Sequence, residues 1–300
     1  KKKVLAIANE MGYVPSANAK SLAEKKSGLI GVLVPNISNL FYSTLVRQLE
    51  NVLRDMGYQM IMATTESSKE YEKKIVEQFV SFRVEGAVIY PSIRENQNPD
   101  YLNVLKLNDI PLVFIGSYYP SVQAPHIMSD IYSGVYQAAE YLYQTGCRSF
   151  YYIGGCKTII SNQLKIMAIA NALKEKGIIF SDERYIELPH TRYEYAYEAF
   201  ERIIRQNPVP DAVIAADAFT GLAVYNVLVK YNISVPQQVS IINFDNLLRP
   251  EICIVQMSCI EQNVEEIVRN AIHILFRQIH GEVQGNCLVA TKMILRKTTK

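Results

Sequence analysis

Polar and aromatic residues follow several short apolar runs of this chain, at positions where a parallel α/β sheet binds ligands. The apolar runs predict buried strands, and ligands of open parallel sheets bind outside the carboxyl ends of the strands. The candidate ligand-binding residues follow such runs, lie on the next helix or lie where the chain would cross between two lobes: Asn36, Ser38, Phe41, Tyr42, Tyr90, Asp130, Ser161, Lys165, Asp217, Asp245 and Gln262. Their hydroxyl, amide and charged groups, combined with aromatic faces, suit a sugar ring.

Many of these residues also have a purely structural explanation. Short polar residues before a helix accept hydrogen bonds from its first N–H groups, and aromatic residues pack readily in cores. The structural alternatives are helix capping for Asn36, Ser38, Asp130 and Asp217, turn formation for Asp245, core packing for Phe41 or Tyr42, and an exposed helix surface for Lys165. Residue type and position alone leave both explanations open.

The elements that must position these residues alternate between strand and helix. Short apolar runs predict strands at 29–34, 59–63, 86–90, 112–115, 150–153, 212–215 and 239–244. Longer amphipathic stretches predict helices at 40–56, 68–83, 131–145, 159–176, 193–206, 218–231 and 263–280. Such alternation predicts parallel sheets with helices on both faces. A pause at 120–125 predicts a crossing between two α/β lobes, a second crossing is expected near 258–262, and a last strand at 287–295 is expected to cross back.

Composition excludes several classes of protein. The chain is 49% apolar and 20% charged, which argues against disorder. Its length of 300 residues exceeds what one hydrophobic core usually holds. No apolar run approaches the ~20 residues that span a bilayer, and the first residues do not resemble a secretory signal, so we expect a cytoplasmic protein. Phosphate-loop, dinucleotide-binding and nucleophile-elbow motifs are missing. The sequence therefore predicts neither an enzyme nor a cofactor.

The cysteines and histidines predict neither disulfide bonds nor a metal site. The five cysteines form no C-x-x-C pair, and the four histidines are widely spaced without an H-E-x-x-H pattern. Free thiols in a reducing compartment are the expected state, and no zinc site is predicted.

Charge is unevenly distributed along the chain. Residues 1–26 hold six Lys and two Glu, a balance of +4, whereas the whole chain has a net charge of +2. A basic arm on a nearly neutral body is typical of a segment that contacts phosphates, although a charged solvated terminus would look alike.

The first 35 residues carry motifs of a known family. Tyr13, Pro15, Ala19, Ser21 and Leu22 form a Y-x-P-x-x-x-A-x-S-L motif, which S-G-L-I-G-V-L-V-P follows at 27–35. Further motifs occur in the expected order: N-I-S-N at 36–39, Gly146, Gly154-Gly155, V-S-I-I-N-F-D at 239–245 and R-K-T-T at 296–299. Together they resemble transcriptional regulators of the LacI/GalR type over nearly the whole chain.

This resemblance implies a fold and a division of the chain. The expected fold is α/β, with two doubly wound parallel-sheet lobes like those of type I periplasmic binding proteins. Residues 1–27 would hold the third helix of a helix-turn-helix head and a hinge helix, the rest of the head preceding them. The N-terminal effector lobe would comprise 28–129 plus 262–287, and the C-terminal lobe 130–261 plus 288–300.

The resemblance also implies a mechanism. Family members pair as homodimers on operator DNA, and a small effector in the cleft between the lobes controls DNA affinity. By resemblance, Ser16, Ala19, Lys20 and Leu22 contact DNA or the partner hinge, with Leu22 wedged into a base step of the minor groove. The predicted function is a repressor controlled by a sugar or sugar phosphate. An extracytoplasmic sugar receptor of a transporter is the alternative, and a sugar-acting enzyme a remote one.

Three positions depart from the family pattern. Lys165 stands where the family usually has Arg, Ala216 where it has Asn, and Gly116 where it often has Asp. Arg grips vicinal hydroxyls or a phosphate with a planar fork, whereas Lys provides a compact point charge. These departures favour a different or larger ligand, either a disaccharide that stacks on aromatic faces or a phosphorylated sugar paired with Lys165.

Overall fold

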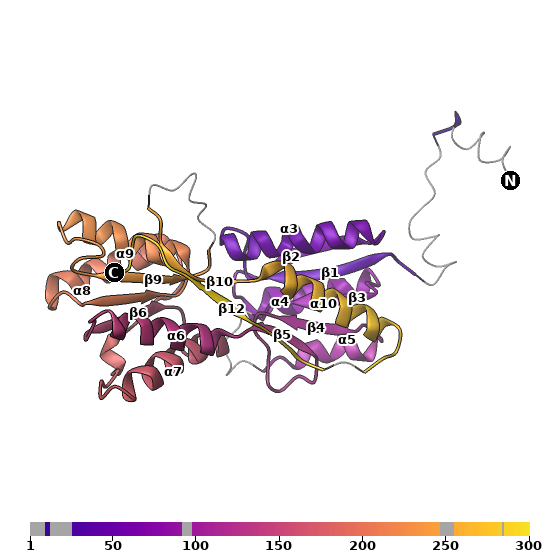
Figure 1. Ribbon diagram of the computed structural model, residues 1–300. Helices are drawn as coiled ribbons and strands as arrows, with labels where there is room; N and C mark the ends of the chain where they lie inside the picture. The colour runs from indigo at the N-terminus through magenta and orange to yellow at the C-terminus, as the bar shows by residue number, and fades with distance from the viewer. Residues whose placement is uncertain (1–9, 13–25, 92–97, 247–254, 284) are drawn as a thin grey trace.

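Two six-stranded sheets, each with helices on both faces, form two lobes that lie end to end (Figure 1). The computed structural model describes residues 10–12, 26–91, 98–246, 255–283 and 285–300. The four residues predicted to contact DNA, Ser16, Ala19, Lys20 and Leu22, lie outside the described residues. The predicted fold class, two doubly wound lobes, is confirmed.

The first lobe contains the sheet β2-β1-β3-β4-β5-β11. Its strands are β1 (Leu29–Val34), β2 (Gln59–Thr64), β3 (Gly86–Ile89), β4 (Leu112–Ile115), β5 (His126–Ser129) and β11 (Cys287–Val289). Its helices are α3 (Leu40–Asp55), α4 (Lys69–Ser81), the 3₁₀ turn η1 (Asp100–Leu102), α5 (Asn103–Leu107) and α10 (Val264–Ile279). One core lies between the sheet and α3 with α10, and a second lies under α4 and α5.

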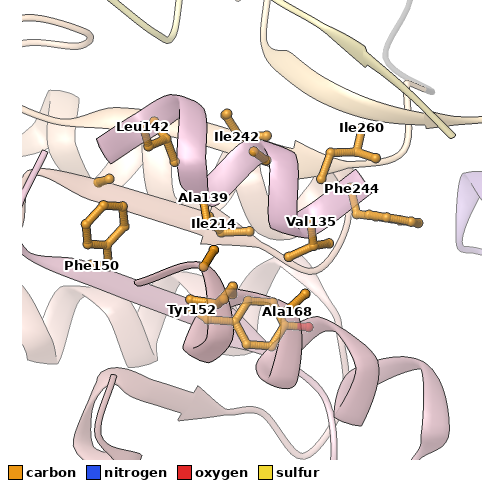
Figure 2. Packing of buried hydrophobic residues seen from close by; sticks show 14 of the residues in the cluster. Val135, Ala139, Leu142, Phe150, Tyr152, Ala168, Ile214, Ile242, Phe244 and Ile260 are labelled. Atoms are coloured by element: carbon orange, nitrogen blue, oxygen red, sulfur yellow. The ribbon is translucent and has the colours of Figure 1, made fainter. Parts of the chain in front are cut away.

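The second lobe repeats this plan with the sheet β7-β6-β8-β9-β10-β12. Its strands are β6 (Phe150–Gly154), β7 (Tyr185–Glu187), β8 (Ala212–Ala215), β9 (Ser240–Phe244), β10 (Ser258–Gln262) and β12 (Thr291–Ile294). Its helices are α6 (Ile131–Gln144), α7 (Ile160–Lys174), η2 (Asp182–Arg184), α8 (Tyr193–Gln206) and α9 (Ala218–Lys230). Figure 2 shows Val135, Ala139 and Leu142 of α6 packed against Ile214 and Ile242 of the sheet.

The order of the strands decides where a ligand can bind. All neighbouring strands run parallel except β12, which is antiparallel to β10. In each lobe the first strand, β1 or β6, lies between the second and third strands of that lobe. The strand order therefore reverses at β1 and at β6, and the crevice at their carboxyl ends is the usual ligand site of such sheets.

Within the described ranges, the chain crosses between the lobes at three places. It passes from β5 to α6 at Asp130, from β10 to α10 at Asn263, and from β11 to β12 at Ala290 (Figure 1). The predicted single strand at 287–295 is wrong, because residues 287–289 pair with β5 and only 291–294 pair with β10. The predicted boundary after residue 287 therefore falls within β11, and the boundary at 261/262 falls within β10.

Candidate functional site

A cleft of about 820 Å³ opens between the facing ends of the two sheets. Its lining includes ten of the eleven predicted ligand-binding residues: Asn36, Ser38, Phe41, Tyr42, Tyr90, Ser161, Lys165, Asp217, Asp245 and Gln262. Strand geometry explains this convergence, since β1, β3, β8 and β9 all end at the cleft.

The first lobe contributes an aromatic wall made of Phe41, Tyr42 and Tyr90. The rings of Tyr42 and Tyr90 meet edge to face, with centroids 4.8 Å apart, and Phe41 lies 5.7 Å from Tyr42 and 6.3 Å from Tyr90. Phe41 is only 4% exposed and belongs to the core, so that Tyr42 and Tyr90 present the accessible surface. Burial raises the pKa of both tyrosines, that of Tyr90 to about 12, so both phenols are neutral hydrogen-bonding groups near pH 7.

The second lobe contributes three buried charged residues, Lys165, Asp217 and Asp245, which are 8%, 6% and 6% exposed. The ammonium of Lys165 donates a hydrogen bond to the carbonyl oxygen of Ala216 at 2.9 Å and lies 4.1 Å from the ring centroid of Phe244. Asp217 follows β8 and Asp245 follows β9, both on the cleft side. The cluster thus contains one cation and two carboxylates, and its net charge is −1 when all three side chains are ionised.

Burial governs the protonation of this cluster. Desolvation raises the pKa of Asp245 to about 6 against the opposing effects of Lys165 and the Gln262 amide. It also raises the pKa of Asp217, although the Thr220 N–H and Lys165 oppose it. Desolvation lowers the pKa of Lys165, and both aspartates counteract that effect.

The carboxylate of Asp245 is fixed at the cleft by its backbone conformation and by a hydrogen bond from Gln262. Its backbone is in the left-handed region, with φ of 74°. Its Oδ1 accepts a hydrogen bond from the Gln262 amide at 2.6 Å, and the Gln262 carbonyl oxygen accepts one from Ser129 Oγ at 2.6 Å. Oδ2 of Asp245 has no hydrogen-bond partner among the described residues, so it can accept a hydroxyl of a ligand.

Side chains of both lobes meet across the cleft. The Asn39 amide donates to Asp217 Oδ2 at 3.2 Å, and Ser129 reaches Gln262 as above. At the mouth, the guanidinium of Arg192 lies 3.4 Å from the Glu66 carboxylate, both side chains being about half exposed. These contacts hold the two lobes in one relative position.

The structural alternatives apply to some predicted residues and not to others. Asp130 is absent from the lining, and its Oδ1 accepts the Ser133 N–H at 3.1 Å, which caps α6. The prediction that Asp130 contacts the ligand is therefore not supported. Asp217 caps α9 and also lines the cleft. Neither Asn36 nor Ser38 caps α3, since Asn39 does so through the Phe41 N–H.

Other lining residues escaped the sequence analysis. Glu66 follows β2, and Arg192 precedes α8 in a loop. Phe219 lies in the first turn of α9, directly after Asp217 and Ala218. Phe219 could have been found, because it lies close to a strand end, whereas the loop position of Arg192 had no signal in the sequence.

Potential metal ligands do not cluster in the described part of the chain. Within it, no three His, Cys, Asp or Glu side chains gather in a manner that could hold a metal ion. No helix among the described residues is both long and apolar enough to cross a membrane. Cys147, Cys156, Cys259 and Cys287 are free thiols.

Two lobes of identical strand order around a polar and aromatic cleft define a ligand-binding protein of the periplasmic-binding-protein class. Residues 139–299 match the family of periplasmic binding protein-like domains. Catabolite control protein A of Priestia megaterium is 25% identical over 303 aligned positions, covering 100% of this chain and 90% of that protein.

Solved structures agree in fold. A periplasmic binding protein/LacI transcriptional regulator from Alkaliphilus metalliredigens, in complex with D-xylulofuranose, is 27% identical with a TM-score of 0.79. The match covers 91% of this chain and 99% of that one. The regulator CcpA of Lactococcus lactis, 21% identical, superposes with a TM-score of 0.82 over 91% of this chain and 99% of its own.

The chain belongs to the periplasmic binding protein-like family, as a transcriptional regulator of the LacI/GalR type. The predicted family and the predicted class of function, a regulator rather than a transport receptor, are thereby confirmed. Relatives of this chain are regulators, not enzymes.

Proposed function

We propose that the cleft binds an uncharged carbohydrate and that this binding controls the affinity of the protein for operator DNA. The observation that carries the proposal is the pairing of the aromatic wall, Tyr42 and Tyr90, with the open Oδ2 of Asp245. A pyranose offers a C–H face to aromatic rings and hydroxyl donors to carboxylates. Asn36, Ser38, Ser161 and Gln262 would add polar contacts around the same ligand.

The charge of the site favours a neutral sugar over a phosphorylated one. Asp217 and Asp245 outnumber Lys165, and a phosphate of charge near −2 would add to this excess of negative charge in a poorly solvated space. The ammonium of Lys165 already donates a hydrogen bond to the carbonyl oxygen of Ala216 and faces the ring of Phe244, so it already has partners within the protein. A sugar phosphate held by Lys165 is the second candidate.

We further propose that the protein acts in the cytoplasm as a homodimer whose hinge segments contact the operator through Ser16, Ala19, Lys20 and Leu22. An effector that changes the relative position of the lobes would change the separation of the hinges in the dimer. Coupling of this kind is typically worth about 1–3 kcal/mol. It requires no catalysis and no cofactor.

A thermal-shift screen tests the effector class. Wild-type protein is heated with ribose, glucose, cellobiose, maltose, glucose 6-phosphate and inorganic phosphate. A ligand at about 100 times its Kd adds roughly 2.7 kcal/mol, which raises the Tm by several degrees. The proposal expects such a rise with a neutral sugar, reduced in Asp245→Asn but retained in Asp55→Asn, which alters an exposed carboxylate at the end of α3. A rise with phosphates alone would instead establish the second candidate.

A further inference from the structure

Gly116 occupies a crowded position at the carboxyl end of β4. It lines the cleft, and its backbone is in the left-handed region, with φ of 71°. A β-carbon at this position would lie 2.1 Å from Cε2 of Tyr90 and 2.8 Å from Cζ. Carbon atoms in proteins essentially never approach so closely. A side chain at 116 and the observed ring of Tyr90 therefore exclude one another.

The Tyr90 ring is also held from its other sides. Tyr42 and Phe41 contact it edge to face, at interplanar angles of 75° and 74°. Phe41 is fixed in the core between β1, α3 and α10. A β-carbon at 116 would thus force Tyr90 to leave the wall for the open cleft, because the core side offers no space.

We infer that Gly116 is a specificity-determining residue: because it has no side chain, the Tyr90 ring can occupy the cleft surface at this point. The inference rests on the proposed function, since it concerns what the cleft selects. With glycine at 116, the ligand meets an aromatic face at this point instead of a polar side chain. The site then selects ligands that present C–H groups there and discriminates against ligands that need a hydrogen-bonding partner at that point.

Gly116 could instead be required only for its backbone conformation, and Gly177 separates the two explanations. Gly177 has a similar φ of 77°, but a β-carbon there would meet nothing within 4 Å. Gly116→Ala and Gly177→Ala therefore share the cost of the left-handed backbone. Only Gly116→Ala adds the collision with Tyr90.

A double-mutant comparison measures this collision without any ligand. We expect the Tm of Gly116→Ala to fall about 5 °C further than that of Gly177→Ala. In a Tyr90→Ala background the two glycine variants should lose similar amounts, because the ring is gone. Equal losses in the presence of Tyr90 would overturn the inference. If Gly116→Ala does not fold, the rescue by Tyr90→Ala remains decisive: a double variant that still fails to fold overturns it.

The position of the ring can be followed by fluorescence, because the chain contains no Trp. Tyr90→Trp introduces a single indole reporter in place of the phenol ring. Quenching of this indole by acrylamide should increase when Gly116→Ala is added and stay unchanged when Gly177→Ala is added. Unchanged quenching in both would contradict displacement of the ring.

The selectivity itself is measured with the neutral sugars of the thermal screen, using cellobiose as reference probe. Gly116→Ala should change the ratio of Kd values between the sugars by about tenfold, corresponding to about 1.4 kcal/mol, and Gly177→Ala should leave that ratio within about twofold. Unchanged ratios in Gly116→Ala would overturn the role in specificity. Failure of the wild-type protein to bind any sugar would instead contradict the proposed function, while the Tm and quenching comparisons would still decide whether Gly116 places Tyr90.

Discussion

The side-chain amide of Asn39 donates a hydrogen bond to Oδ2 of Asp217, 3.2 Å away and 178 residues further along the chain. The two residues belong to different lobes, and each also caps a helix. Oδ1 of Asn39 accepts the Phe41 N–H, and Oδ1 of Asp217 accepts the Thr220 N–H, both at 2.8 Å. The bond joins the N-termini of α3 and α9, so a change in the angle between the lobes must stretch or break it.

Replacing the amide by a carboxylate should open the cleft. Asn39→Asp keeps the oxygen that caps α3, since Asp and Asn cap equally well. It places a negative charge against Asp217, which is 6% exposed, and like charges at this distance repel. We expect a loss of about 2 kcal/mol in unfolding free energy and a larger radius of gyration in small-angle X-ray scattering.

Asn39→Ser is the control for this variant, because serine also caps helices but brings no charge. Its radius of gyration should stay close to that of the wild type. The same radius in Asn39→Asp as in Asn39→Ser would show that a negative charge at position 39 does not open the cleft.

Much of the fold could be predicted because buried strands and amphipathic helices leave strong local patterns. The helix predicted at 193–206 coincides with α8, and the strand predicted at 29–34 with β1. By contrast, β7 and β5 have only three and four residues, and β5 directly follows the segment P-S-V-Q-A-P at 120–125, so neither has a distinct pattern. Short strands of this kind are fixed by their neighbours in the sheet and not by their own sequence.

The lining of the cleft could be predicted where it depends on the strands, because the strands themselves have clear local patterns. Residues that follow strands had to meet at one edge of each sheet, which brought Asn36 and Tyr90 together in the first lobe and Asp217 and Asp245 in the second. Contacts that depend on the placement of one lobe against the other, such as Arg192 with Glu66, have no signature in sequence spacing. The residue type of Asp130 did not distinguish its helix cap from a ligand contact, because both require the same kind of side chain.

The raised pKa of Asp245 should make stability depend on pH. Its value of about 6 in the folded protein exceeds the ordinary 3.8, so folding disfavours the carboxylate. The resulting cost is absent below pH 3.8, grows between pH 3.8 and about 6, and is complete above pH 6, where it reaches about 3 kcal/mol. Urea unfolding of Asp245→Asn should lack this pH-dependent loss, which the wild type shows between pH 4 and 7. Parallel pH profiles of the two proteins would show that the pKa of Asp245 is not raised on folding.

Leu22 bears on DNA binding and not on the cleft. In the protein with its complete DNA-binding head, Leu22→Ala should weaken operator binding, because an apolar wedge would no longer enter the base step. Fluorescence anisotropy with labelled operator measures this, and sugar affinity by calorimetry should stay the same. Undiminished operator affinity would refute the wedge proposed by resemblance, without bearing on the cleft.

Lys165 should stabilise the folded protein through its charge, because it interacts electrostatically with two buried carboxylates. Lys165→Met keeps much of the length of the side chain but leaves Asp217 and Asp245 without a buried cation. Removing one partner of a buried ionic group typically costs about 3 kcal/mol or more, so we expect a loss of that size at pH 7. The loss should shrink at pH 5, because Asp245, whose pKa is raised to about 6, is then largely protonated and no longer needs a cation.

Lys174 lies on the same helix, α7, but is exposed, and Lys174→Met is therefore the matched control. Its effect should stay within about 0.5 kcal/mol at both pH values. Chemical denaturation of the two variants at pH 7 and pH 5 provides the comparison. If Lys165→Met cost no more than Lys174→Met at pH 7, the two aspartates would have to be neutral in the folded protein. An uncharged pair could not then favour a neutral sugar over a phosphate by charge, and that part of the proposed selectivity would have to come from the shape of the cleft.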